Sequence, residues 1–226
     1  MNNEAFVLSS PEKHKTHDII NARMWPWLEL NFSRGGKIIT MPSSSGRQEN
    51  MILSQIKDLE RINKEESKLK LLTFDNIYEA EKTGITEIEH GHRLWKHERC
   101  PDIFRRLLSK KREEEPVAAW FDLTGGLLNQ RLLDIKECVA SMFDHGSLLF
   151  ITLAIDNLRG LSDEHYVAHF YRSFDKRISR AFVTDLLLTE TISKTKNKYI
   201  TECMPPYVYK RRSVTYGVFG YIVGKM

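Results

Sequence analysis

Two alternating stretches near the end of the chain decide the fold. Residues 198–209 read KYITECMPPYVY, residues 214–224 read VTYGVFGYIVG, and Lys210-Arg211-Arg212-Ser213 joins them. Apolar and polar side chains that alternate along the chain indicate strands, and so short a connection brings two strands together as an antiparallel hairpin. The sequence therefore predicts a sheet that closes with an antiparallel pair.

Upstream of this hairpin the pattern changes. Strands that are apolar on both faces belong to parallel sheets covered by helices, and residues 117–121 and 147–155 show this character most clearly. A long helix is predicted at residues 163–189, directly before the hairpin. Three earlier strands are predicted at residues 37–41, 69–74 and 85–89, and further helices at 48–64, 77–82, 102–111 and 127–143. The predicted fold is α/β: a doubly wound, mostly parallel, seven-stranded sheet with a C-terminal antiparallel hairpin.

The sequence predicts one main domain and a short N-terminal addition. Residues 35–226 contain no internal repeat, no low-complexity tract and no obvious linker, so they are assigned to a single domain. Residues 1–34 are assigned to a helical appendage. Within it, residues 18–32 suit a short apolar helix that Pro26 is expected to break.

Composition and cysteine usage narrow the class of protein. The chain is 41% hydrophobic and 28% charged, which is typical of a globular protein and excludes a disordered one. Its cysteines, Cys100, Cys138 and Cys203, are far apart and form no CxxC, so neither a disulfide framework nor a zinc site is expected. This cysteine usage predicts a cytoplasmic location. We see no signal peptide at residues 1–10. The longest apolar run, residues 148–155, is far shorter than the roughly twenty residues of a membrane helix.

The net charge of +4 is mild, but the basic residues gather in groups. These groups fall within residues 93–112, 172–180 and 194–212. Solvated helix faces and hairpin strands would account for them. Basic surface also lowers the cost of approaching a polyphosphate, so nucleic acid stays open as a partner.

The order of elements is similar to that of the class I S-adenosylmethionine-dependent methyltransferases. That family has a doubly wound sheet whose last strand inserts antiparallel, and the resemblance covers residues 35–226, most of the chain. It rests on the order and spacing of the elements. It implies a methyltransferase that binds S-adenosylmethionine, with the ligand at the carboxyl ends of the strands.

The resemblance assigns cofactor-binding roles to the first two strand ends. The loop after the first strand, which approaches the methionine part of the cofactor in this family, contains Pro42, Ser43, Ser44, Ser45 and Gly46. A plain strand-to-helix loop with a serine N-cap is the alternative. The second strand is followed by Asp75 and Asn76, and Asp75 stands where the family has the acidic residue that binds the ribose hydroxyls. Asp75 could equally be the N-cap of the short helix that follows.

The third and fourth strand ends complete the predicted site. Glu89 and His90 follow the third strand, where the family places a polar residue near the adenine. Asp122, Leu123 and Thr124, followed by two glycines, end the fourth strand at the position that usually touches cofactor and substrate. Methyl transfer needs an in-line approach and in some cases a base, so Asp122 is the candidate base or orienting group. His90 and His92 are its alternates.

Two further motifs could suggest other functions. Pro205-Pro206-Tyr207 resembles the Pro-Pro-Tyr motif of amino-group methyltransferases, but it lies in the sixth strand and follows a methionine, so a bulge or edge role is expected. The spacing of the histidines in residues 89–97 fits no compact zinc pattern. The leading hypothesis is a methyltransferase acting on nucleic acid or protein rather than a metabolite. The alternatives are an inactive relative that serves as a binding or structural subunit, and an enzyme that uses another nucleotide.

Overall fold

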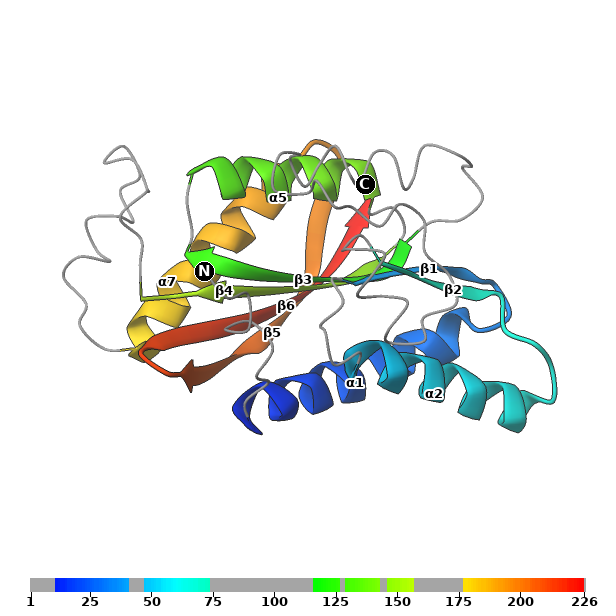
Figure 1. Ribbon diagram of the computed structural model, residues 1–226. Coiled ribbons are helices and arrows are strands. Elements are labelled where there is room, and N and C mark those ends of the chain that lie inside the picture. The colour runs from blue at the N-terminus through cyan, green and yellow to red at the C-terminus, as the bar shows by residue number, and fades with distance from the viewer. Residues whose placement is uncertain are drawn as a thin grey trace. The chain divides into compact units, whose positions relative to one another are not determined.

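The computed structural model describes residues 11–40, 47–73, 116–126, 129–142, 146–156 and 177–225 (Figure 1). The chain divides into two compact units, Met1–Trp120 and Phe121–Met226, and the division falls within one strand. The first unit contains parallel strands and the second an antiparallel hairpin.

The strands of the first unit are short and parallel. β1 (Gly36–Thr40) lies between β2 (Leu69–Thr73) and the first residues of β3 (Pro116–Gly126), and both pairings are parallel. All five residues of β1 are buried. A strand covered on both faces needs apolar side chains at consecutive positions, and Ile38 and Ile39 provide them. The parallel start of the sheet is therefore confirmed.

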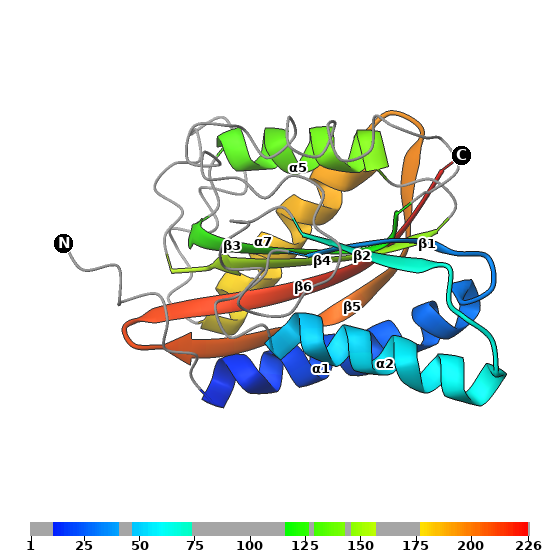
Figure 2. The same cartoon turned by 45° about the vertical axis from the view of Figure 1, so that its right-hand side comes forward.

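Two helices lie side by side along β1 and β2 in both views (Figures 1 and 2). α1 spans Pro11–Asn31 and α2 spans Arg47–Asn63. The predicted break at Pro26 is wrong, because α1 continues through this residue. Proline removes the hydrogen bond to the carbonyl four residues earlier, but Pro26 and Ala22 are both exposed, so water can reach that carbonyl. The buried face of α1 carries Ile20, Met24 and Leu28.

The second unit contains the predicted hairpin. β5 (Lys198–Arg211) pairs antiparallel with β6 (Val214–Lys225), and β6 pairs antiparallel with β4 (Ser147–Ala154). The turn between β5 and β6 has Arg212 in the left-handed region, with φ 54°. The register shifts between Met204 and Tyr207, where the two prolines stand, as expected for a bulge. The antiparallel end of the sheet is therefore confirmed.

The helices of the second unit are α5 (Asn129–Met142) and α7 (Arg177–Ser193). α7 packs on β5 and against α5. Glycine in β6 makes room for large side chains on neighbouring strands: a Cβ on Gly220 would lie 2.9 Å from Phe150 Cε1 and 2.9 Å from Met204 Sδ. Because Phe150 is almost fully buried and cannot move aside, Gly220 is a packing requirement of this sheet.

The strand count and one strand boundary differ from the expectation. The described residues form six strands rather than seven, and the strand predicted at 85–89 lies outside them, as do the helices at 77–82 and 102–111. β3 does not end at Phe121 but continues to Gly126, so Asp122 lies within a strand. In the part of the chain that is described, no helix is long and apolar enough to cross a membrane. The chain is thus α/β, with parallel strands followed by an antiparallel hairpin.

Candidate functional site

The carboxyl end of β1 is buried and polar. Thr40, the last residue of β1, is fully buried, and its Oγ1 donates a hydrogen bond to Glu49 Oε1 over 3.3 Å. Glu49 belongs to the first turn of α2 and is also fully buried. A buried carboxylate is costly unless it is hydrogen-bonded or paired, so its place beside a strand end marks this region as a candidate binding site.

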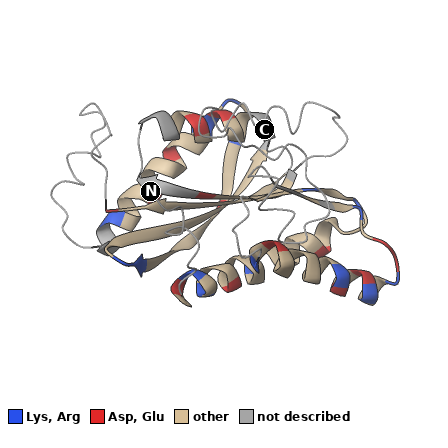
Figure 3. Ribbon diagram, viewed as in Figure 1, with Lys and Arg blue, Asp and Glu red and all other residues tan. Residues whose placement is uncertain are grey.

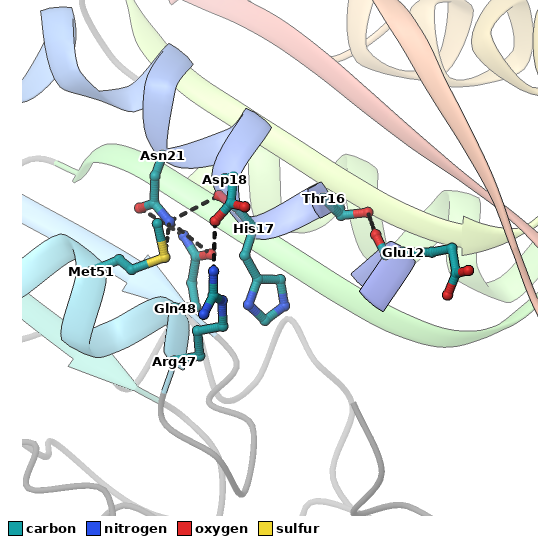
Figure 4. A network of polar contacts seen from close by, with 8 residues as sticks. All are labelled: Glu12, Thr16, His17, Asp18, Asn21, Arg47, Gln48 and Met51. Atoms are coloured by element: carbon teal, nitrogen blue, oxygen red, sulfur yellow. Dashed lines mark hydrogen bonds and ion pairs between the residues drawn. The ribbon is translucent and has the colours of Figure 1, made fainter. Parts of the chain in front are cut away.

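A pair of buried amides joins α1 to α2 next to this carboxylate (Figure 4). Asn21 Nδ2 donates to Gln48 Oε1 over 3.2 Å, and Gln48 Nε2 donates to Asn21 Oδ1 over 3.1 Å. Asn21 Nδ2 also lies 2.8 Å from the His17 carbonyl oxygen. At the outer side, the Arg47 guanidinium forms a partly exposed ion pair with Asp18 at 2.9 Å. The reciprocal amide bonds fix the start of α2 against α1.

An aromatic contact completes this buried group. The His17 ring meets the Trp120 ring edge to face, with centroids 5.2 Å apart and planes at 79°. Trp120 is aligned with Thr40 in the pairing of β3 with β1. We call the six residues that share this position the β1-end cluster: His17, Asn21, Thr40, Gln48, Glu49 and Trp120.

Most of the predicted cofactor residues lie outside the described residues. This is so for Pro42 to Gly46, Asp75, Asn76, Glu89 and His90, and also for His92. The structure does place the two ends of the first loop, because β1 ends at Thr40 and α2 begins at Arg47. Thr40, Gln48 and Glu49 of the β1-end cluster therefore flank the predicted cofactor loop in the sequence. Sequence reasoning missed Gln48 and Glu49. The available signal was their position, since these two polar residues stand at the start of an amphipathic helix, directly after the predicted cofactor loop.

In the second unit, Asp122 is half-buried within β3, and Leu123 and Thr124 follow it in the same strand. Burial raises the pKa of Tyr209 of β5 well above its usual value, and the negative charge of Asp122 raises this pKa further.

Tyr209 is the middle ring of three stacked tyrosines. Its ring lies 6.2 Å from that of Tyr207, at 22°, and 5.3 Å from that of Tyr216, at 16°. Tyr209 and Tyr216 are directly opposite each other in the hairpin. We call Tyr207, Tyr209 and Tyr216 the tyrosine ladder. Tyrosines at alternate positions of a strand were visible in the sequence, but their cross-strand partner depends on register.

Sequence reasoning also missed another acidic residue of this unit. Asp156 follows β4, just as Asp122 follows an apolar run in β3. Its Oδ2 accepts a hydrogen bond from the Thr215 backbone N–H, and its Oδ1 lies 3.2 Å from Arg180 Nη1 of α7. Asp156 therefore ties the end of β4 to α7 and to β6, which is a positioning role.

A third polar contact joins α7 to the hairpin. Tyr221 Oη donates to Asp185 Oδ1 over 2.6 Å. Burial raises the pKa of Asp185, and the hydrogen bond from Tyr221 opposes this rise. Among the described residues, no group of three or more His, Cys, Asp or Glu side chains could hold a metal ion.

No family model and no curated protein matches the chain. Solved structures do resemble it. The N-methyltransferase NodS from Bradyrhizobium japonicum WM9 is 8% identical, covers 95% of this chain and 99% of its own, and gives a TM-score of 0.46. An rRNA methylase from Streptococcus thermophilus is 15% identical over 95% of this chain and 98% of its own, with a TM-score of 0.41. The fibrillarin pre-rRNA processing protein of Methanococcus jannaschii is 8% identical over 84% and 67%, with a TM-score of 0.42. These are proteins that the chain is similar to, and its own strand pairings are those given above.

Proposed function

We propose that the chain binds S-adenosylmethionine and transfers its methyl group, with nucleic acid or protein as the acceptor. The observation that carries this proposal is the β1-end cluster: a buried carboxylate and buried amides at the carboxyl end of a parallel strand. Open parallel sheets bind ligands at this end, in the loops between strand and helix.

The residues present fit the chemistry of this cofactor. S-adenosylmethionine carries an ammonium group and a sulfonium, and a cationic ligand is stabilised by a buried carboxylate such as that of Glu49. The amide pair fixes α2, so the carboxylate does not have to be oriented when the ligand binds. When bound, the cofactor would supply the activated methyl group.

The predicted cofactor residues keep their roles within this proposal. Pro42 to Gly46 connect Thr40 with Arg47 and would contact the methionine part of the cofactor. Asp75 and Asn76 would bind the ribose hydroxyls, and Glu89 and His90 would lie near the adenine. Asp122, with Leu123 and Thr124, is a separate proposal: its carboxylate would orient or deprotonate the methyl acceptor.

Titration calorimetry with S-adenosylmethionine and S-adenosylhomocysteine tests the proposal. We expect micromolar binding by the wild type and a loss of about tenfold or more in Glu49→Gln and in Asp75→Ala, since each removes a charge-assisted hydrogen bond. Glu66→Gln makes the same change as the first variant at an exposed position of the same unit and should bind like the wild type. Circular dichroism and thermal melting show whether each variant is folded.

The result that would overturn the proposal is a folded wild type that shows no heat with either ligand at millimolar concentration. That result would favour the second candidate function, a methyltransferase-like protein that acts as a binding subunit without the cofactor. One observation favours this alternative: residues 41–49 contain a single glycine, whereas the family has two or three in this loop.

A further inference from the structure

The two faces of the β5–β6 hairpin differ in what covers them. Side chains on a strand point alternately to opposite faces. Tyr221 of β6 is bonded to Asp185 of α7, so its face is the one that α7 covers. Tyr216 is five positions away along the same strand and therefore lies on the opposite face, together with its cross-strand partner Tyr209. The tyrosine ladder is not part of the core beneath α7.

The ladder is only partly covered. Tyr209, the middle ring, is 7% exposed, while the outer rings of Tyr207 and Tyr216 are half-buried. All three rings are nearly parallel, and the outer two keep part of their surface exposed. Parallel aromatic surface of this kind accepts a further planar ring by stacking.

Positive charge lies directly next to the ladder. The hairpin turn carries Lys210 and Arg212, which are exposed, and Arg211, which is half-buried. The end of the hairpin is blue, the colour of Lys and Arg, in Figure 3. Arg211 is two positions from Tyr209 on the same face of β5, and its charge lowers the pKa of Tyr209. Arg211 therefore shares the face of the stacked rings, and Lys210 and Arg212 lie on either side of it in the chain, at the end of the hairpin.

We propose that the tyrosine ladder and the basic turn bind single-stranded nucleic acid, with the phosphates at Lys210 and Arg212 and a base stacked on Tyr207 or Tyr216. This inference rests on the proposed function, and it names a nucleobase in a single strand as the class of methyl acceptor. A duplex keeps its bases stacked within the helix and cannot offer a free base face to the ladder.

Fluorescence anisotropy with a labelled 12-nucleotide RNA, without S-adenosylmethionine, tests this site. The wild type should bind the single strand, and its affinity should fall steeply as salt rises. Tyr207→Ala and Tyr216→Ala should each weaken binding about tenfold, the loss of one stacked base. Tyr216→Phe keeps the ring and should bind like the wild type. Tyr199→Ala changes another partly exposed tyrosine of β5 and serves as the matched control.

The salt dependence of binding tests the basic turn. Lys210→Gln combined with Arg212→Gln should reduce the slope of log affinity against log salt by about two, one for each lost phosphate contact. Binding that is equal for duplex and single strand, or equal in folded Tyr207→Ala and Tyr216→Ala variants, would overturn the proposal. So would binding of an arginine-rich peptide at this surface in place of RNA. Calorimetry separates the two proposals. RNA binding without cofactor binding would contradict only the proposed methyltransferase activity. Cofactor binding without RNA binding would contradict only the proposed RNA site.

Discussion

β1 and β5 are strands of the same protein that are held in place by different means. Each of the five residues of β1 is buried, whereas only Lys198 and Tyr209 of the fourteen residues of β5 are. β1 is fixed by apolar cover on both faces, and β5 mainly by its hydrogen bonds to β6. The side chains of a strand that is held by backbone pairing are not all required for packing. The difference indicates that side chains of β1 contribute more to the stability of the fold than those of β5.

The largest expected effect comes from removing apolar volume in β1. Ile39→Ala should lower the free energy of unfolding by roughly 2–5 kcal/mol, because Ile39 is fully buried and its loss leaves a cavity. The matched change in β5, Ile200→Ala, removes a half-buried side chain and should cost about 1 kcal/mol or less. Urea denaturation measures both. Equal losses at the two positions would contradict the comparison.

Gly220 is a position of the hairpin where packing leaves little room for a side chain. Gly220→Ala should lower the free energy of unfolding by about 1–3 kcal/mol, because the added methyl group would overlap the buried Phe150 ring. Gly146→Ala is the contrasting variant: nothing lies within 4 Å of its Cβ position, and its cost comes from the positive φ of 82° alone. If substituting Gly220 costs less than substituting Gly146, overlap with Phe150 is not the reason for this glycine.

Polar groups in the first unit should show the same dependence on burial. Asn21→Ala leaves the buried Gln48 amide without its reciprocal bonds, and we expect a loss of roughly 1–3 kcal/mol in unfolding free energy. Asn63→Ala removes a side-chain bond to the Leu59 carbonyl at the exposed end of α2 and is the matched control. A double-mutant cycle with Gln48→Ala should show coupling, and strictly additive losses would contradict the pairing.

The smallest effect is expected from Asp185 and depends on pH. The pKa of Asp185 is raised in the folded protein, so folding favours the protonated form. Its contribution to stability is complete below the usual value of 3.8 and is lost as the pH rises through the raised pKa. Asp185→Asn should flatten this part of the curve of unfolding free energy against pH. Tyr221→Phe removes the hydrogen bond that lowers the pKa of Asp185 and should make this part of the curve steeper.

The sequence predicted backbone elements better than contacts between them. The hairpin was predicted at 198–209 and 214–224 and is found at Lys198–Arg211 and Val214–Lys225, because alternation and a short turn are local signals. β3 was predicted too short, because a carboxylate and two glycines indicate a strand end although pairing can extend past them. The continuity of α1 through Pro26 depends on solvent at Ala22, which the sequence does not reveal.

The candidate sites were harder to predict because their members are distant in the chain. Asn21 and Gln48 are 27 positions apart, and Asp156 and Thr215 are 59 apart, so no local pattern joins them. Asp122 was predicted from its position after an apolar run, and the structure places it within β3. Its catalytic role and the roles of the predicted cofactor residues stay predictions.

Pro205 and Pro206 affect how copies of this protein behave toward one another. Among the described residues, β5 pairs with β6 and with no other strand, so its second edge offers backbone groups to any strand that approaches. Proline has no N–H to donate, and the register shift between Met204 and Tyr207 bends the same stretch. An approaching strand would find the middle of this edge without regular donors. The two prolines thus make this edge a poor template for pairing with a strand of another copy.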